Sequence, residues 1–260
     1  MQDVYQEIIE FVVTSGKRLK TCAGQIEDIG VFKKYLTEED LAIERGLKEI
    51  IQRHNPDHQL YAEEENETFP EGAQDVWVAD PISGTKTFIQ GLSHYGMAVM
   101  HQHEGVPQFA VVYDPSIDEL FTAFRGQGAF LNGKPISVST GNNTSRIVFN
   151  LSSHWPDKVS SQAMTDLLGN FQLFRNTNSQ AVNLCHVACG RFDGVMNFLK
   201  DSYPAFVGGF IIQEAGGVFH NSAESETLHP DDRVFIGGNR DIVNILQAMV
   251  RLDNQGKMQQ

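Results

Sequence analysis

VWVADPISGTKTFI, residues Val76–Ile89, combines a short apolar strand with a polar turn. Its first four residues are apolar, β-prone and include a tryptophan, which predicts a buried strand. Pro81 has no N–H group and disfavours a helical conformation at the preceding residue, so we expect the strand to stop at Asp80. Gly84 lets the backbone approach a ligand closely. A carboxylate at a strand end before such a turn suits a hard cation and a phosphate, although the turn alone is as often structural.

Two helices and several strands are predicted around this segment. Apolar residues recur with helical spacing from Asp3 to about Cys22. Thr37 and the acidic residues after it predict the start of a second helix, which ends near Arg53. Asn132-Gly133 is a strong hairpin signal. Further strands are expected at Leu60–Ala62, Gly96–His103, Pro107–Tyr113, Glu119–Arg125, Ala129–Leu131 and Ile136–Val138. The first half is therefore predicted to hold two helices and a largely antiparallel sheet.

Residues 141–144 form the best candidate for an internal boundary, because strands and helices alternate beyond them. The expected strands are Arg146–Leu151, Phe171–Arg175, Gly194–Phe198, a stretch near Val218, and Val234–Gly237. The expected helices are Asp157–Leu168, Ser179–Gly190, Ala205–Ala215 and a last one from Asp241. We therefore expect a layered α/β protein with halves at residues 1–140 and 141–260, packed as one compact unit.

Composition limits the classes of partner. The chain has 260 residues, 41% hydrophobic and 20% charged, with a net charge of −13, which is ordinary for a globular protein but argues against direct binding to nucleic acid or an anionic membrane. An acidic protein that handles phosphate needs bound cations. Three cysteines without a framework spacing favour a reducing compartment. No signal-peptide pattern or membrane-length apolar stretch is present, so we expect a cytoplasmic protein.

Three acidic positions lie before or within the central turn: Asp40, Glu63 and Asp80. The acidic run Glu63–Glu65, taken alone, is typical of a solvated surface. Two strand ends can, however, place carboxylates side by side around a divalent ion, and the order strand, acid, strand, acid favours that interpretation.

Several motifs in the same order resemble one family. Asp80–Thr85, DPISGT, is similar to the motif D-P-[IL]-D-G-T, and Tyr113–Gly133, Ala181–Gly194 and Glu214–Gly217 also match in sequence order. Together they resemble the inositol monophosphatase family of lithium-sensitive, magnesium-dependent phosphomonoesterases. The resemblance covers nearly the whole chain. It implies an αβαβα sandwich of the inositol monophosphatase and fructose-1,6-bisphosphatase type, and inline attack on phosphorus by a metal-activated water.

The resemblance also implies roles for individual residues. Glu63, Asp80 and the carbonyl of Ile82 are similar to the ligands of the family's first metal. Glu63 and Thr85 would orient and deprotonate the attacking water. Asp40 resembles an acid that bonds to Thr85 and helps to activate the water.

The turn itself resembles the family's phosphate-binding segment. Ser83, Gly84 and Thr85 occupy it, and the N–H groups of Gly84 and Thr85 would hold phosphate oxygens. This half of the family's site is complete in the sequence.

Three positions depart from the family pattern. The second Asp of the motif, a ligand of the second metal, is Ser83 here. Counting back from Glu214–Gly217 puts Pro204 where the family has the other second-metal aspartate, and Asn197 where it has an acid that contacts substrate hydroxyls. Asp201, three residues before Pro204, could compensate only if its loop were rearranged. Because magnesium binds through charged oxygens, we expect one magnesium site and a weakened second site.

Two hypotheses follow for the function. The first is a phosphomonoesterase of reduced activity that acts on a small phosphorylated polyol such as inositol monophosphate. GTKTFIQG also resembles the corresponding stretch of histidinol-phosphate and bisphosphate-nucleotide phosphatases. The second is a catalytically inactive pseudophosphatase that binds a phosphorylated ligand or a protein, as some bacterial members are partners of the transcription machinery. Either form is expected to be a homodimer, as is usual in the family.

Other reactive side chains are interpreted as structural. His101 and His103 alternate along one strand, and we expect both to face solvent rather than a metal. His186 is expected to be a packed histidine. Cys185 and Cys189 are four residues apart, and we interpret them as buried small hydrophobes rather than a metal or redox pair. Arg191 is expected to pair with a neighbouring acid.

Overall fold

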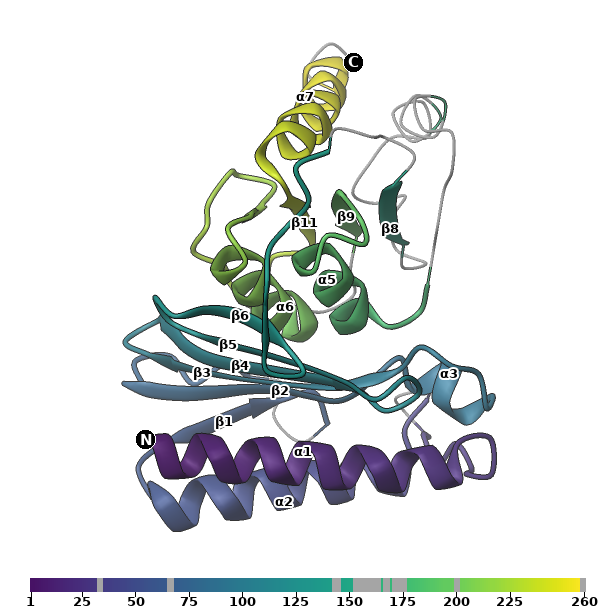
Figure 1. Ribbon diagram of the computed structural model, residues 1–260, viewed down its shortest axis with the longest axis vertical. Coiled ribbons are helices and arrows are strands. Elements are labelled where there is room, and N and C mark those ends of the chain that lie inside the picture. Colours follow the sequence, from purple (N-terminus) through teal and green to yellow (C-terminus); the bar gives the residue numbers. More distant parts are fainter. Residues whose placement is uncertain are drawn as a thin grey trace.

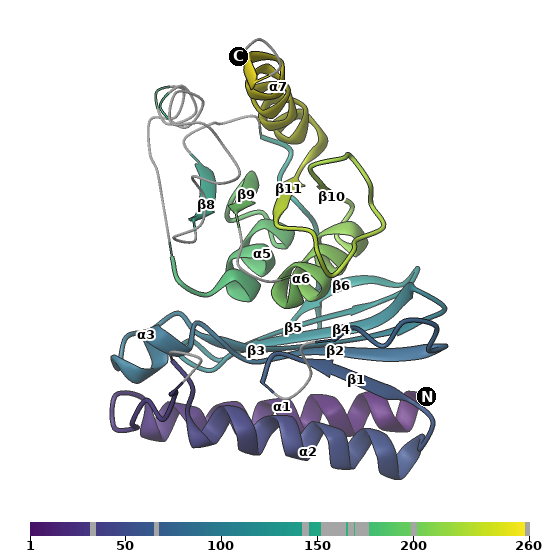
Figure 2. The same ribbon diagram turned by 180° about the vertical axis from the view of Figure 1, so that it is seen from behind.

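The chain forms five alternating layers of helices and sheets (Figure 1). The structure is a computed structural model and describes residues 1–31, 35–64, 68–141, 146–151, 165, 169, 177–198 and 202–257. Helices α1 (Gln2–Cys22) and α2 (Glu38–His54) form one outer layer, and α7 (Arg240–Lys257) covers the opposite end. Helices α5 (Gln180–Ala188) and α6 (Tyr203–Glu214) lie between two sheets, as both views show (Figures 1 and 2). The predicted αβαβα sandwich is confirmed.

The two sheets differ in size and in strand order. In the described residues, the large sheet has seven strands in the order of the sequence, and the small sheet has four in the order β10-β11-β9-β8. The large sheet contains β1 (Gln59–Ala62), β2 (Asp75–Ser83), β3 (Gly96–His103), β4 (Val106–Asp114), β5 (Glu119–Phe124), β6 (Gly128–Leu131) and β7 (Lys134–Ile136). The small sheet contains β8 (Ile147–Leu151), β9 (Gly194–Phe198), β10 (Val218–Asn221) and β11 (Val234–Gly238).

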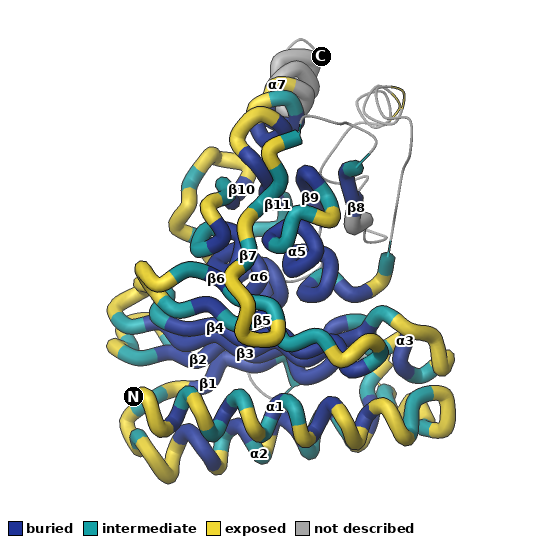
Figure 3. The backbone as a smooth tube through the Cα atoms, viewed as in Figure 1, coloured by how far each residue is buried: buried dark blue, intermediate teal, exposed yellow. Residues whose placement is uncertain are grey.

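Helices α1 and α2 cover one face of the large sheet because each has a single apolar side. Val4, Ile8 and Val12 of α1 are buried, and they belong to the same core cluster as Trp77 of β2. Exposed residues lie on the outer side of both helices, whereas the central strands are buried (Figure 3). Helix α2 begins with a capping box, in which Thr37 and Asp40 bond each other's backbone N–H groups. Both helices lie where the sequence predicts them.

The parallel pairing of β1 with β2 is an exception in an otherwise antiparallel large sheet. Ala62 pairs with Ala79, so both strands run toward the same edge of the sheet. The prediction that the strand stops at Asp80 is wrong, because β2 continues to Ser83. Its register against β3 shifts between Asp80 and Ser83, which adds one residue to β2. The missing N–H of Pro81 is tolerated because it falls within this β-bulge.

Helix α6 begins two residues earlier than predicted and ends as expected. Pro204 lies in its first turn, a position that needs no proline N–H. At the other end Gly216 has a φ of 81°, and the N–H groups of Gly216 and Gly217 bond to the carbonyls of Gln213 and Ile212. These are the bonds of a Schellman motif, so the two glycines end the helix.

Some predicted features lie outside the described residues. They are residues 142–144 of the proposed boundary, nearly all of the helix at 157–168, and the strand at 171–175. The large sheet takes its strands from residues before 137 and the small sheet from residues after 146, and the division into halves stays a prediction. Among the helices of the described ranges, none combines the length and apolar character needed to cross a membrane.

Close packing between α5 and α6 makes a glycine necessary at position 208. A Cβ added to Gly208 would lie 2.4 Å from the Cβ of Leu184, close to the backbone of α5. We expect Gly208→Ala to lower the free energy of unfolding by up to about 2 kcal/mol, since an overpacking cost of about 1–3 kcal/mol is offset by about 1 kcal/mol of helix propensity gained. Urea unfolding measures the effect.

Gly46→Ala is the matched control. It also changes a glycine inside a helix, and its Cβ would lie 2.4 Å from the Phe11 ring. Phe11 is only half-buried and can rotate away. We expect this variant to match or exceed the stability of the natural chain, and equal losses in the two variants would contradict the packing argument.

Candidate functional site

Two acidic residues lie at the edge of the large sheet where β1 and β2 end. Glu63 directly follows β1, and Asp80 lies on β2 one residue beyond the Ala62–Ala79 pair. Asp80 is 3% exposed and Glu63 is half-buried. In the described ranges, the carboxylate oxygens of these residues and Asp40 do not form a group of three within 4.8 Å. The parallel strand pair thus brings Glu63 and Asp80 to one edge of the sheet.

Asp40 is held rigidly at the start of α2. Its Oδ2 accepts hydrogen bonds from the backbone N–H of Thr37 at 2.8 Å and from the Thr37 hydroxyl at 2.6 Å. The side chain is fully buried, and this burial raises its pKa from 3.8 to about 7. The bonds from Thr37 oppose the rise, whereas the nearby charges of Glu64 and Glu63 add to it. Asp40 therefore faces the acidic strand end.

Glu44 is a residue that the sequence analysis missed. It lies one helical turn after Asp40 on α2, is buried, and its Oε2 accepts the backbone N–H of Glu64 at 3.0 Å. This bond ties the segment after β1 to α2, and so fixes the end of the strand that carries Glu63. Its spacing of four residues from Asp40 places both acids on the same helix face, which is the signal that could have identified it.

Thr85 links Asp40 to the end of β2. Its hydroxyl donates to the carbonyl of Ile82 at 2.8 Å, and its Oγ1 lies 3.5 Å from Oδ1 of Asp40. The preceding Gly84 has a φ of 95°, and a Cβ there would lie 3.3 Å from both Ser179 and the carbonyl of His94. A glycine is therefore required where the chain turns from β2 into α3 (Thr85–Ile89).

The residues at the positions that depart from the family motif are packed or hydrogen-bonded within the protein. The hydroxyl of Ser83 accepts the backbone N–H of Ala181, in the first turn of α5, at 3.2 Å. Pro204 is buried in the first turn of α6, and the ring of the preceding Tyr203 stacks on Tyr61 with 4.5 Å between centroids. Asn197 is fully buried on β9. Asp201 lies outside the described residues.

The donors at this edge fit one hard cation. Glu63, Asp80 and the Ile82 carbonyl offer only oxygen atoms, which magnesium and calcium prefer. The Ile82 carbonyl accepts the Thr85 hydroxyl, and a carbonyl oxygen has two lone pairs. The positions that the family resemblance assigns to a second metal do not fit one, because Ser83 is neutral and bonded to α5, and the Pro204 side chain has no donor atom.

A histidine cluster lies at the other end of β2, and it corrects one expectation. His101 does not face solvent: it is 2% exposed, beneath Tyr5 of α1, whose hydroxyl lies 2.8 Å from Nδ1 of His101. Burial lowers the pKa of His101 to about 4 despite the neighbouring carboxylate of Asp75. His103 is more exposed, and its hydrogen bond to Asp75 raises its pKa. The strand pattern could not reveal that α1 covers this face.

The expectations for His186, Arg191 and Cys185 are confirmed, whereas Cys189 is only partly buried. His186 packs near Phe121 and Phe192, and burial lowers its pKa to about 4. Arg191 forms a bidentate ion pair with Glu119. The three cysteines are free, with Cys185 fully buried, so that its thiol pKa is raised.

Asp40 gives the protein a specific pH dependence when no metal is bound. Its pKa is higher in the folded protein than in the unfolded chain, so the folded state binds more protons between about pH 4 and pH 7. Stability contributed by protonated Asp40 is complete below pH 4 and is lost as the pH rises through 7. A pKa near 7 corresponds to a loss of up to about 4 kcal/mol.

In the variant Asp40→Asn, residue 40 cannot ionise, so the variant should not lose this stability as the pH rises. Measured by urea unfolding in EDTA, the stability of the variant relative to the natural chain should increase between pH 4 and pH 8. Glu38→Gln, which alters an exposed carboxylate of the same turn, is the matched control. Parallel stability profiles for Asp40→Asn and the natural chain would show that Asp40 titrates normally.

Known proteins match both the sequence and the fold. Residues 4–251 match the sequence pattern of the inositol monophosphatase family. The Nus factor SuhB of Escherichia coli K12 is 33% identical over 225 residues, which cover 84% of this chain and 82% of that protein. The inositol-1-monophosphatase of Rhizobium meliloti is 28% identical over 252 residues, 94% of each chain.

Solved structures share the layered fold. The suhB protein of Bartonella henselae superposes with a TM-score of 0.84 at 23% identity, over 95% of this chain and 98% of that one. The inositol monophosphatase of Anabaena superposes with a TM-score of 0.80 at 26% identity, over 96% and 97%. On the sequence match, which spans nearly its whole length, the chain belongs to the inositol monophosphatase family.

Proposed function

We propose that this chain is a magnesium-dependent phosphomonoesterase of reduced activity, acting on a small phosphorylated polyol such as inositol monophosphate. The observation that carries the proposal is the link from Asp40 through Thr85 to the Ile82 carbonyl, beside the acidic ends of β1 and β2. The family is magnesium-dependent, and these oxygen donors suit one magnesium ion. The name of the Rhizobium relative supports inositol monophosphate as the first substrate to test.

The chain's own groups support hydrolysis in distinct ways. Thr85 would position a water, and Asp40, with a pKa of about 7, is suited to accept a proton at neutral pH. The backbone N–H groups of Gly84 and Thr85 would hold phosphate oxygens, with Ser83 completing the turn. A bound magnesium ion would supply positive charge to the phosphoryl oxygens and activate the water.

Reduced activity follows from the charge lost at the second metal position. Ser83 replaces one anionic ligand and Pro204 another, so developing charge on the leaving oxygen lacks a metal to balance it. Removing even one electrostatic contact to a developing charge typically slows a reaction by about 100-fold to 1,000-fold. We therefore place the expected rate several orders of magnitude below that of a two-metal site.

A second candidate is a pseudophosphatase that binds a protein or a phosphorylated ligand. Its support is that Ser83 bonds to α5 and Tyr203 stacks on Tyr61, so protein contacts occupy the second-metal side. The relatives named Nus factor SuhB support a regulatory role. The acidic charge favours a protein partner over nucleic acid or membrane. In both cases we propose a cytoplasmic homodimer with a single magnesium site.

Magnesium-dependent phosphate release from inositol 1-phosphate separates the two candidates. We expect slow release by the natural chain and none by Asp80→Asn, because that variant loses an anionic ligand. Ser83→Asp with Pro204→Asp should raise the rate by restoring two anionic ligands. Histidinol phosphate and a bisphosphate nucleotide extend the substrate panel.

Asp57→Asn is the control, since it makes the same change at an exposed residue before β1 and should keep the natural rate. Turnover by the double variant alone would establish the pseudophosphatase. Equal rates in the natural and double-variant chains would contradict the assignment of Ser83 and Pro204. No release by any chain, with all of them folded, would refute the phosphatase proposal for these substrates.

A further inference from the structure

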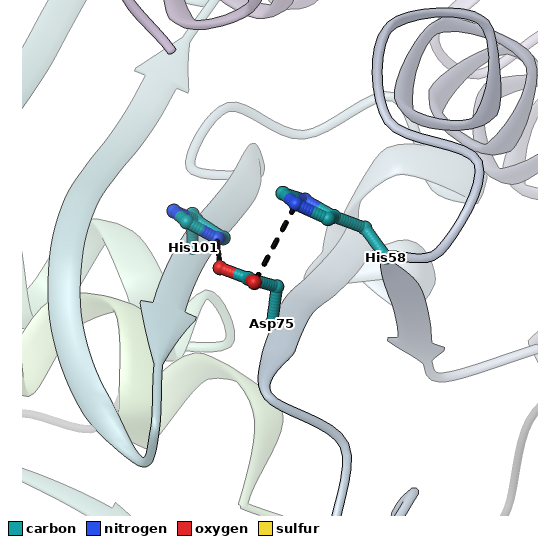
Figure 4. Close-up of side chains that lie close together, drawn as sticks. All are labelled: His58, Asp75 and His101. Carbon is teal, nitrogen blue, oxygen red and sulfur yellow. Dashed lines mark hydrogen bonds and ion pairs between the residues drawn. The ribbon is translucent and has the colours of Figure 1, made fainter.

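Three side chains from separate segments converge at the start of β2 (Figure 4). His58 lies in the turn between α2 and β1, Asp75 is the first residue of β2, and His101 is on β3. One nitrogen or oxygen of each lies within 4.8 Å of the other two. Asp75 and Asp80 are five residues apart on one strand, roughly 16 Å, so this cluster is separate from the candidate phosphatase site.

Each imidazole has one nitrogen close to a different oxygen of the Asp75 carboxylate, at a distance near that between ligand atoms of a tetrahedral ion. Nε2 of His101 lies 3.0 Å from Oδ1 of Asp75, and Nε2 of His58 lies 3.6 Å from Oδ2. Zn–N bonds of about 2.0–2.1 Å and Zn–O bonds of about 2.0–2.2 Å put neighbouring ligand atoms about 3.4 Å apart. Both imidazoles turn a nitrogen toward the carboxylate.

We propose that His58, Asp75 and His101 bind a zinc-class divalent ion. Two imidazole nitrogens and one carboxylate oxygen are a donor set that zinc accepts, with a fourth position left open. Nδ1 of His103 lies 2.8 Å from the same carboxylate, and His103 is partly exposed. Either His103 or a water molecule would therefore be the fourth ligand of the ion. The ion would cross-link β2, β3 and the turn before β1.

The outer nitrogens of the two rings have different partners. Nδ1 of His101 faces the Tyr5 hydroxyl, whose oxygen can accept an N–H from a ring that ligates through Nε2. Nδ1 of His58 instead accepts the indole N–H of Trp77 at 3.1 Å. Because an indole only donates, His58 carries its proton on Nε2 when no ion is bound. Ion binding through Nε2 moves that proton and breaks the Trp77 bond.

Calorimetric titration with zinc chloride tests the site on the full chain. We expect one zinc ion to bind, with an affinity at least about tenfold weaker in His58→Gln and in Asp75→Asn. Binding should persist in Asp80→Asn and in excess magnesium, since imidazole nitrogens favour zinc. His229→Gln is the matched control, because it removes an exposed histidine that also lies near a carboxylate, that of Asp231.

The NMR resonance of the Trp77 indole N–H is a second readout of zinc binding. It should shift only if the ion binds through Nε2 of His58 and breaks the hydrogen bond between His58 and Trp77. The nitrogen-15 resonance, assigned by its loss in Trp77→Phe, should shift on addition of zinc to the natural chain and stay unchanged in His58→Gln. His58 lies in the turn before β1 and not in a strand, so this variant tests the site even if Asp75→Asn fails to fold. Absence of zinc binding, equal affinity in His58→Gln and the natural chain, or an unmoved Trp77 resonance would each overturn the proposal.

Discussion

The parallel pairing of β1 with β2 is the constraint on which the candidate site depends. In an antiparallel pair the two strands would end at opposite edges of the sheet, and Glu63 would lie far from Asp80. The parallel pair instead brings both acids to one edge, and α2 covers that edge with Asp40 and Glu44. Placing acids there costs free energy: burial raises the pKa of Asp40, and the nearby charges of Glu64 and Glu63 add to the rise. The same arrangement underlies the proposal that this edge binds a cation.

Sequence patterns predicted the parts of this arrangement that depend on residues close together in the chain. Helical spacing located α1, a capping box located α2, and the order of acids and strands indicated Asp40, Glu63 and Asp80. They failed where tertiary packing decides. Pro81 could continue a strand only because a bulge absorbs it, and His101 is buried only because Tyr5 of α1 lies over it. Neither the bulge nor the burial of His101 can be predicted from the residues that are adjacent in sequence.

The two replacements at the second-metal position share a structural consequence. Ser83 accepts a backbone N–H from the first turn of α5, and Pro204 occupies the first turn of α6, where a missing N–H has no cost. Both helix starts are therefore stabilised without a bound ion. An aspartate pair would need a cation to balance its charge, in a protein whose net charge is already −13. On the proposed assignment of these two positions, helix-start contacts stand where a second cation would otherwise be needed.

The two ends of β2 differ in the chemistry of their donors, and this difference determines which ions each end favours. Asp80 is accompanied by a carboxylate and a backbone carbonyl, whereas Asp75 is accompanied by imidazoles. An acidic protein attracts divalent cations of every kind, so overall charge cannot select among them. Selection must come from the ligand atoms, since oxygen donors favour magnesium and imidazole nitrogens favour zinc. One strand can therefore hold two carboxylates roughly 16 Å apart without the two sites competing for the same ion.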